Sequence, residues 1–298
     1  MFWLAWLACA PPEPEGLSRP NVVAVGDDGA VYVSDFGNDR IVQLDPDGEV
    51  VRRFGSRGLS QGQLWRVYAL AVDRDGSLLV ANRRPEDPTS SEGDTWEVKR
   101  FVDGVETEVI PFQGHFTSTS HTMHSFDVRP DGSLLVANPA GGELFLLGPH
   151  GSYQGAYGGA LRSDAAPHAV DVQGEVAWVV DQRAHRLAVV GPEGERLVRL
   201  AYGEPGALSF PSALAVCPGR WVAVADLGNH RVQRFDLDGR FLGSFSPERA
   251  GPDQPVQLLS LAVSPDCTKL YLADSKGDRV LVTTPEGEVL RVVSRVVD

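Results

Sequence analysis

Short apolar runs separated by turn-forming residues define the pattern of this chain, and the clearest example lies between residues 211 and 246. Apolar residues dominate 214–216, 221–225, 232–235 and 241–245, and the sequences between these runs are CPGR, DLGN and DLDG. Short β-branched and aromatic runs with Asp, Gly and Pro between them are typical of β-strands joined by tight turns. The stretch therefore predicts one small sheet of four antiparallel strands.

The same pattern recurs through the whole chain. When each copy is aligned on the central dipeptide of its first strand, six copies begin at Ala24-Val25, Ala71-Val72, Asp127-Val128, Asp171-Val172, Ala215-Val216 and Ala262-Val263. A four-stranded unit that repeats about every 40 to 50 residues is characteristic of a β-propeller. We expect an all-β fold, a six-bladed β-propeller of four-stranded antiparallel blades at about 21–54, 68–110, 124–157, 168–202, 212–245 and 259–293.

Two segments resemble a known repeat family. Residues 37–48 read GNDRIVQLDPDG and residues 228–239 read GNHRVQRFDLDG, and each follows an alternating strand that ends in Asp. These sequences resemble NHL repeats, and the resemblance extends over residues 20–294. It implies the propeller fold but leaves the activity open, because similar propellers include scaffolds, RNA-binding proteins, lyases and lactonases.

An Asp at the end of the second strand is followed by an Arg five residues later in four of the six copies. The pairs are Asp35 with Arg40, Asp181 with Arg186, Asp226 with Arg231, and Asp274 with Arg279. In the second and third copies Asn82 or Asn138 replaces the acid and the Arg is missing. Because the two charges appear and vanish together, we expect each Asp to pair with its Arg and to accept loop N–H groups, as a structural feature of each blade.

Composition narrows the possible partners. The chain has 298 residues, a net charge of −13 and a pI near 5.0. One closed ring uses nearly all of this length, so we expect a single propeller domain over 20–298 and a monomer. Binding to nucleic acid is disfavoured because phosphate contacts need a basic face, and Arg52, Arg53, Arg57 and Arg66 form the one basic neighbourhood.

Residues 1–19 differ in character from the rest. The sequence MFWLAWLACA is followed by PPEPEG, an extended linker. Leu7-Ala8-Cys9 resembles the end of a bacterial lipoprotein signal, which would place an acylated Cys9 at the mature amino terminus. This resemblance predicts an exported protein held at the bacterial cell envelope by a lipid anchor; the alternative is an unprocessed, frayed terminus.

The two remaining cysteines, Cys217 and Cys267, occupy equivalent turns in blades five and six. In an exported protein they would form a disulfide between these blades. Two unpaired buried thiols are the alternative.

The lengths of the connections between strands indicate which face of the propeller binds ligands. Links between the first and second strands, and between the third and fourth, are short and uniform, whereas the long irregular segments 55–67, 83–94, 113–123 and 246–257 connect blades or join second to third strands. Because strands within a blade are antiparallel, these long links all lie on one face, where binding residues are usually found. Trp65, Arg66, Arg83 and Arg84 are the expected contacts there for a protein or small-molecule ligand with anionic groups.

One position enters each first strand from that face, beside the central channel. Its six occupants are Asn21, Tyr68, His124, His168, Ser212 and Leu259. We expect Asn21, Tyr68 and Ser212 to contribute to binding there. Neutral imidazoles in neighbouring blades suit zinc, so His124 and His168 are candidate metal ligands.

Pro167-His168 resembles the histidine motif of the peptidyl-hydroxyglycine amidating lyase, a zinc enzyme built on a propeller. A third ligand would have to come from His115 or His121, and Tyr68 could act as acid or base or stabilise an oxyanion. A lactonase-like site would instead hold a divalent metal such as calcium with carboxylates, for which Asp127 and Asp171 are candidates. The structural alternative makes both histidines polar lining residues of a wet channel mouth.

Two hypotheses follow from these observations. In the first, the propeller is an exported binding or scaffolding module that uses the face of the inter-blade loops, and no cofactor is required. In the second, it is a metal-dependent lyase or hydrolase centred on His124 and His168.

Overall fold

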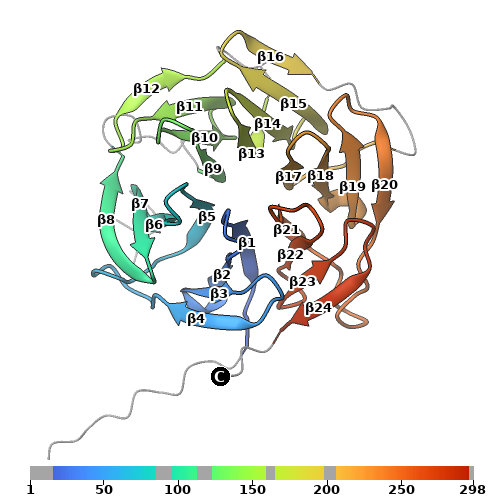
Figure 1. Ribbon diagram of the computed structural model, residues 1–298, viewed down its shortest axis with the longest axis horizontal. Helices are drawn as coiled ribbons and strands as arrows, with labels where there is room; N and C mark the ends of the chain where they lie inside the picture. Colours follow the sequence, from blue (N-terminus) through green and yellow to red (C-terminus); the bar gives the residue numbers. More distant parts are fainter. Residues whose placement is uncertain (1–15, 85–94, 113–122, 159–164, 198–205, 295–298) are drawn as a thin grey trace, which may run out of the picture.

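The computed structural model describes residues 16–84, 95–112, 123–158, 165–197 and 206–294 as a ring of six four-stranded antiparallel sheets (Figure 1). In every sheet the strands are hydrogen-bonded in chain order, with the first strand innermost and the fourth at the rim. The six-bladed propeller predicted from the repeats is confirmed. Cys9, His115 and His121 lie outside the described residues. Within those residues no helix is long and apolar enough to cross a membrane.

The blades have the following strands. Blade one contains β1 (Pro20–Val25), β2 (Val31–Asp35), β3 (Arg40–Leu44) and β4 (Val50–Phe54), and blade two contains β5 (Val67–Val72), β6 (Leu78–Arg84), β7 (Thr95–Val102) and β8 (Val105–Pro111). Blade three contains β9 (Ser125–Val128), β10 (Leu134–Asn138), β11 (Glu143–Leu147) and β12 (Tyr153–Ala156), and blade four contains β13 (Pro167–Gln173), β14 (Val176–Asp181), β15 (Arg186–Gly191) and β16 (Gly194–Leu197). Blade five contains β17 (Ala213–Cys217), β18 (Trp221–Asp226), β19 (Arg231–Asp236) and β20 (Phe241–Phe245), and blade six contains β21 (Leu258–Val263), β22 (Leu270–Asp274), β23 (Arg279–Thr283) and β24 (Val289–Val293). Two single 3-10 turns, η1 (Phe36–Asn38) and η2 (Leu227–Asn229), follow β2 and β18.

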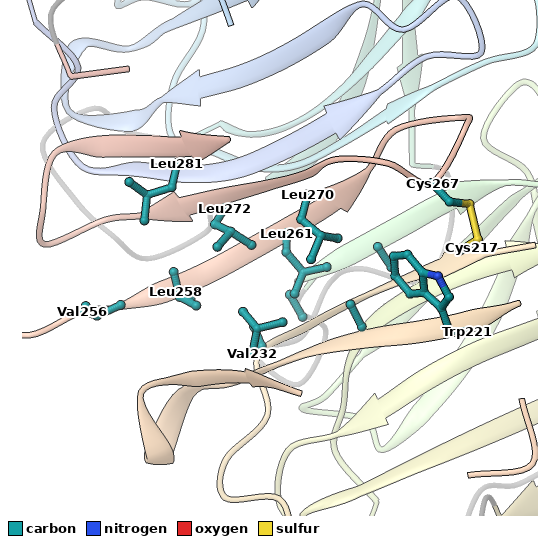
Figure 2. Packing of buried hydrophobic residues seen from close by; sticks show 14 residues of the cluster. Cys217, Trp221, Val232, Val256, Leu258, Leu261, Cys267, Leu270, Leu272 and Leu281 are labelled. Carbon is teal, nitrogen blue, oxygen red and sulfur yellow. A yellow bond between two sulfur atoms is a disulfide. The ribbon is translucent and has the colours of Figure 1, made fainter. Parts of the chain in front are cut away.

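The hydrophobic core is divided among the interfaces between neighbouring blades. Each of the six clusters of buried apolar residues draws its members from two adjacent blades. Figure 2 shows the cluster between blades five and six, where Trp221 and Val232 face Leu261 and Leu272. A single four-stranded sheet cannot bury both of its faces, so each blade is stabilised by its two neighbours.

The position of a strand within its blade sets its pattern of side chains. The second strands β10, β18 and β22 are buried along their whole length, because both of their faces meet another blade. The outer strands β8 and β20 alternate between more and less exposed residues. Continuous apolar runs in second strands and alternation in fourth strands are therefore consequences of the ring.

Blade six closes the ring by packing directly against blade one. Val23 and Val33 of blade one share a buried cluster with Ala262, Tyr271 and Val280 of blade six. Hydrogen bonds reinforce the closure: for example, the Val23 N–H donates to Ser260 Oγ at 3.2 Å, and the Leu17 N–H donates to the Ser294 carbonyl at 3.1 Å. Among the strands that the structure describes, each of these two blades uses four consecutive strands of its own.

The predicted Asp–Arg pairs are confirmed in all four blades. The Arg Nε donates to the Asp carboxylate at 2.8 to 3.0 Å for Arg40, Arg186, Arg231 and Arg279. The other carboxylate oxygen accepts a backbone N–H from the segment that enters the blade, and the donors are Ser18, Ala166, Ser209 and Gln257. Each Asp thus ties the incoming connection to the hairpin between the second and third strands.

In blade five the structure explains why the repeat has Gly followed by Asn at residues 228 and 229. The Gly228 N–H donates to the Ser209 carbonyl at 2.8 Å, and a Cβ on Gly228 would lie 2.8 Å from that same oxygen, so no larger residue fits. Asn229 Nδ2 donates to Asp226 at 2.8 Å. His230 follows with a φ of 52°, a left-handed conformation that His, Asn and Asp adopt more readily than most residues.

In blades two and three, a hydrogen bond from an Asn side chain to a Glu takes the place of the Asp–Arg ion pair. Asn82 Nδ2 donates to Glu97 at 2.8 Å, and Asn138 Nδ2 donates to Glu143 at 3.3 Å. Asn82 Oδ1 still accepts the incoming Trp65 N–H at 2.6 Å. The connection into blade two is therefore held as in the charged blades, whereas Asn138 Oδ1 in blade three accepts the Gly141 N–H of its own hairpin at 3.1 Å.

Candidate functional site

The structure brings His124 and His168 together at the channel mouth. His124 precedes β9 and His168 lies near the start of β13, and their rings meet edge to face with centroids 4.7 Å apart. His124 Nδ1 is 3.1 Å from His168 Nε2, and His168 Nδ1 is 2.8 Å from the Ser212 carbonyl oxygen. The equivalent positions of blades three, four and five are thus linked by one hydrogen-bonded chain.

Partial desolvation at the channel mouth lowers the pKa of both imidazoles, which are therefore neutral near pH 7. Desolvation lowers the pKa of His124 to about 4, and the neighbouring His168 adds to this effect. Desolvation also lowers the pKa of His168, although the hydrogen bond to the Ser212 carbonyl favours its protonated form. Neutral imidazoles are the form that accepts hydrogen bonds or binds metals.

The distance between the two facing nitrogens is close to that between two ligands of one metal ion. Two nitrogens bound to one tetrahedral zinc at about 2.0–2.1 Å lie roughly 3.3 Å apart, close to the observed spacing of His124 Nδ1 and His168 Nε2. No group of three His, Cys, Asp or Glu side chains suited to a metal occurs among the described residues. Both predicted third ligands, His115 and His121, fall outside those residues.

Two predicted binding residues have a different role in this structure. Ser212 is 2% exposed and its Oγ donates to the Leu258 carbonyl of blade six at 2.7 Å. Asn21 Nδ2 donates to the Val67 carbonyl of blade two at 2.8 Å. Both side chains point toward the next blade, where they pair with a strand edge; in the structure they join blades, and their part in ligand binding stays a prediction.

Tyr68 is the centre of an aromatic cluster at the edge of the mouth. Its ring centroid lies 5.9 Å from that of Phe36 and 5.3 Å from that of Trp96, both in edge-to-face arrangements. The Arg19 guanidinium lies 5.6 Å from the Phe36 ring and that of Arg83 lies 6.0 Å from the Trp96 ring. These five residues form the aromatic edge. Sequence reasoning found Tyr68 and Arg83 but missed Arg19, Phe36 and Trp96, which occupy non-equivalent positions in their blades.

The remaining predicted contacts lie beside this edge. The Arg57 guanidinium covers the Trp65 ring at 4.5 Å, and Arg66 is exposed with a φ of 53°. The Arg66 carbonyl accepts the Arg83 N–H at 3.3 Å, so the connection into blade two is fixed to the end of β6. Arg84 is the last residue of β6, and its side chain lies outside the described set.

A central channel of about 490 Å³ runs behind the mouth, and two carboxylates lie in it. Asp127 accepts the Val128 N–H at 2.8 Å and the Val172 N–H at 2.7 Å. Asp171 accepts Gln173 Nε2 at 2.6 Å and the Val216 N–H at 2.8 Å. Each carboxylate therefore joins its own blade to the inner strand of the next one.

Burial in the channel opposes ionisation of this carboxylate pair. Desolvation and the charge of Asp171 raise the pKa of Asp127 to about 7, although hydrogen bonds from Val172 and Val128 oppose the shift. Desolvation raises the pKa of Asp171 to about 6 against the hydrogen bonds from Gln173 and Val216. The pair therefore holds protons at a pH where most carboxylates have lost them.

We expect this pair to make the propeller less stable as the pH rises. Both carboxyls carry raised pKa values in the fold, so their contribution to stability is complete below the ordinary value of 3.8 and is lost as the pH rises through about 6 to 7. Urea unfolding at about pH 5 and about pH 8 should show this loss, on the order of 1–3 kcal/mol, in the parent relative to an Asp127→Asn, Asp171→Asn variant.

Comparison with the variant isolates the carboxylates from other titrating groups in the channel. His124 and His168 act in the opposite direction, since their lowered pKa values favour the fold as the pH rises. Asp27 and Arg74 line the far end of the channel, and Asp27→Asn serves as the control. Equal pH profiles for the parent and the double variant would contradict the prediction.

Comparison with known proteins supports the repeat assignment. The family model of the NHL repeat matches residues 208–235, which lie mostly in blade five. No curated protein matches the sequence. Among solved structures, a chain of hydrazine synthase from Kuenenia stuttgartiensis aligns with a TM-score of 0.61 at 13% identity, over 96% of this chain and 100% of that one.

Two further structures show the same architecture. Virginiamycin B lyase from Staphylococcus aureus aligns with a TM-score of 0.59 at 12% identity, over 92% of this chain and 84% of that one. A chain from a nidogen/laminin complex aligns with a TM-score of 0.62 at 16% identity, over 83% of this chain and 85% of that one. At these identities the likeness shows the fold alone. The chain is therefore a six-bladed β-propeller of four-stranded blades, and residues 208–235 match the NHL repeat.

Proposed function

We propose that this protein is a binding propeller that holds a ligand or partner protein over the channel mouth, on the face of the inter-blade loops. The observation that carries the proposal is the aromatic edge, in which Tyr68 lies between Phe36 and Trp96 and two guanidinium groups flank the cluster. Aromatic and Arg side chains gathered on one rim are enriched at interaction sites.

The chemistry of the edge favours an aromatic ligand with an anionic group. Tyr68 and Phe36 are partly exposed and offer ring edges for stacking, while Arg19 and Arg83 supply positive charge in a protein whose net charge is −13. A protein partner would satisfy the same edge with an exposed aromatic side chain beside a carboxylate.

Small aromatic acids test this proposal. Ligand-observed NMR with phenylacetate and indole acetate should show binding that weakens about tenfold in each of Tyr68→Ala and Arg83→Ala. Val105→Ser, on the outer strand β8 where Val105 is 63% exposed, should bind as the parent does. Binding that is unchanged in both edge variants would place the ligand elsewhere and overturn the proposal.

A second function is supported by the histidine pair: a metal-dependent lyase or hydrolase at the channel mouth. Metal-ligating histidines commonly donate their other ring N–H to a carbonyl, as His168 Nδ1 does to Ser212. One structure of similar fold is a catalytically inactive histidine-to-alanine variant of virginiamycin B lyase with quinupristin, at a TM-score of 0.60 and 11% identity. That likeness is one of fold, so the pair itself supports this second candidate.

Metal content distinguishes the two functions. If the second holds, the purified protein binds one zinc ion, and the His124→Ala, His168→Ala variant loses it along with any lyase or hydrolase activity. Calcium content measured in the same samples tests the carboxylates of the lactonase-like alternative. Zinc that is absent, or that the variant retains, would remove the support for the enzyme.

We also propose that the protein is exported, held at the cell envelope through Cys9, and monomeric. The Cys217–Cys267 disulfide supports export, since disulfides persist in oxidising compartments. Metabolic labelling with an alkyne fatty acid should tag the parent and leave Cys9→Ser untagged. An untagged parent would remove the anchor while leaving the binding function untouched.

A further inference from the structure

The hydrogen bonds at the channel mouth fix the protonation of both histidine rings. The Ser212 carbonyl can only accept, so His168 Nδ1, at 2.8 Å, must carry a proton. In the neutral ring the other nitrogen is then an acceptor, and it lies 3.1 Å from His124 Nδ1. His124 Nδ1 must therefore donate, and His124 Nε2 is left with a lone pair and no proton.

His124 Nε2 is the free end of this series of hydrogen-bonded groups. The side chain of His124 is exposed, whereas those of His168 and Ser212 are more buried. Among the described residues Nε2 of His124 has no hydrogen-bond partner. The mouth thus presents one acceptor of fixed orientation, and rotation of the imidazole by half a turn would cost the contact with His168.

We propose that His124 Nε2 selects ligands that donate a hydrogen bond from an N–H or O–H group beside an aromatic ring. The inference rests on the proposed binding function, because the ligand must reach the mouth, where Tyr68 of the neighbouring blade supplies the aromatic edge. A ligand that offers only an acceptor there meets a lone pair and is disfavoured.

The position of the proton on His124 also distinguishes hydrogen bonding to a ligand from metal binding. A metal bound between the two rings would need lone pairs on His168 Nε2 and His124 Nδ1, so His124 would have to move its proton to Nε2. His168 would keep its proton on Nδ1 in both states. The protonation of His124 therefore reports which role the mouth has.

Nitrogen NMR of ¹⁵N-histidine-labelled protein tests the arrangement directly, since protonated and unprotonated ring nitrogens have well-separated chemical shifts. At neutral pH without metal, both His124 and His168 should carry their proton on Nδ1, and Ser212→Ala should retain this pattern because its backbone carbonyl remains. His168→Phe should release His124 to the mixture of forms found in free histidine. A proton on Nε2 of His124 in the parent would overturn the inference.

Matched probes test the selectivity. Indole and phenol should bind about three- to tenfold more tightly than N-methylindole and anisole, which keep the ring but lack the donor. In His124→Phe this preference should disappear while Tyr68-dependent binding remains. Equal affinities within each pair in the parent would overturn the inference and leave the binding function standing; loss of binding for all four probes would instead count against the proposed function, with the NMR result still deciding the state of His124.

Discussion

Replacing Asp226 with Asn is expected to lower the free energy of unfolding by about 3–5 kcal/mol, the range typical of breaking a buried charge pair from one side. Asp226 is 0% exposed, and its carboxylate accepts hydrogen bonds from the Ser209 N–H, Asn229 Nδ2, Arg231 Nε and Gln233 Nε2. An amide at this place removes the negative charge and turns one acceptor into a donor that faces other donors.

A double-mutant cycle separates the pair from the rest of the network. Chemical denaturation of Asp226→Asn, Arg231→Ala and the double variant should give a coupling energy of about 1–3 kcal/mol. Asp238→Asn, in an exposed turn of the same blade, should change stability by less than about 0.5 kcal/mol. Strictly additive losses at Asp226 and Arg231 would contradict the pairing.

This pairing could be predicted from sequence because the repeats provide an internal comparison. The Asp and Arg occur together or not at all, at a constant offset, and a cross-strand pair is the physical arrangement that such an offset allows. The partner of Asn82 escaped the same reasoning. The long segment between β6 and β7 places Glu97 fifteen residues after Asn82, although the two are still direct cross-strand neighbours.

The histidine pair could also be predicted, since equivalent positions in adjacent blades lie side by side on a ring. The alignment of the repeats does not, however, predict the direction in which a side chain points. Ser212 and Asn21 occupy the same position as His124, but their short side chains bond to the next strand edge, whereas the imidazole of His124 reaches the mouth. Side-chain length therefore decides which occupants of this position are available to a ligand.

The aromatic edge was only partly predictable for a related reason. Phe36 belongs to η1 after the second strand and Trp96 to the start of β7, so neither is equivalent to Tyr68. Their contact arises from the way neighbouring blades and loops converge on the mouth, which a repeat alignment does not describe. Whether Asp127 and Asp171 faced the channel was likewise open from alternation alone, and the structure places both among its lining residues.

Removal of the Cys217–Cys267 disulfide is expected to lower the free energy of unfolding by about 4 kcal/mol, as the entropy of an open loop of about this length implies. The bridge spans 50 residues and joins the end of β17 to the turn between β21 and β22 (Figure 2). It therefore fastens blade six, which closes the ring, to blade five. Both cysteines are buried, at 0% and 8% exposure, beside Trp221 in the shared cluster, so serine at either place would also leave a hydroxyl in an apolar site.

Two measurements separate the bridge from the packing of its sulfur atoms. Denaturation of the parent with and without reductant gives the contribution of the bond alone, and a Cys217→Ala, Cys267→Ala variant should match the reduced parent and show no response to reductant. Peptide mapping under non-reducing conditions, on protein from its native compartment, should recover the two cysteines in one linked peptide pair. Free thiols at both positions would contradict the bridge and would remove its support for export, because the bond is expected only where the compartment is oxidising.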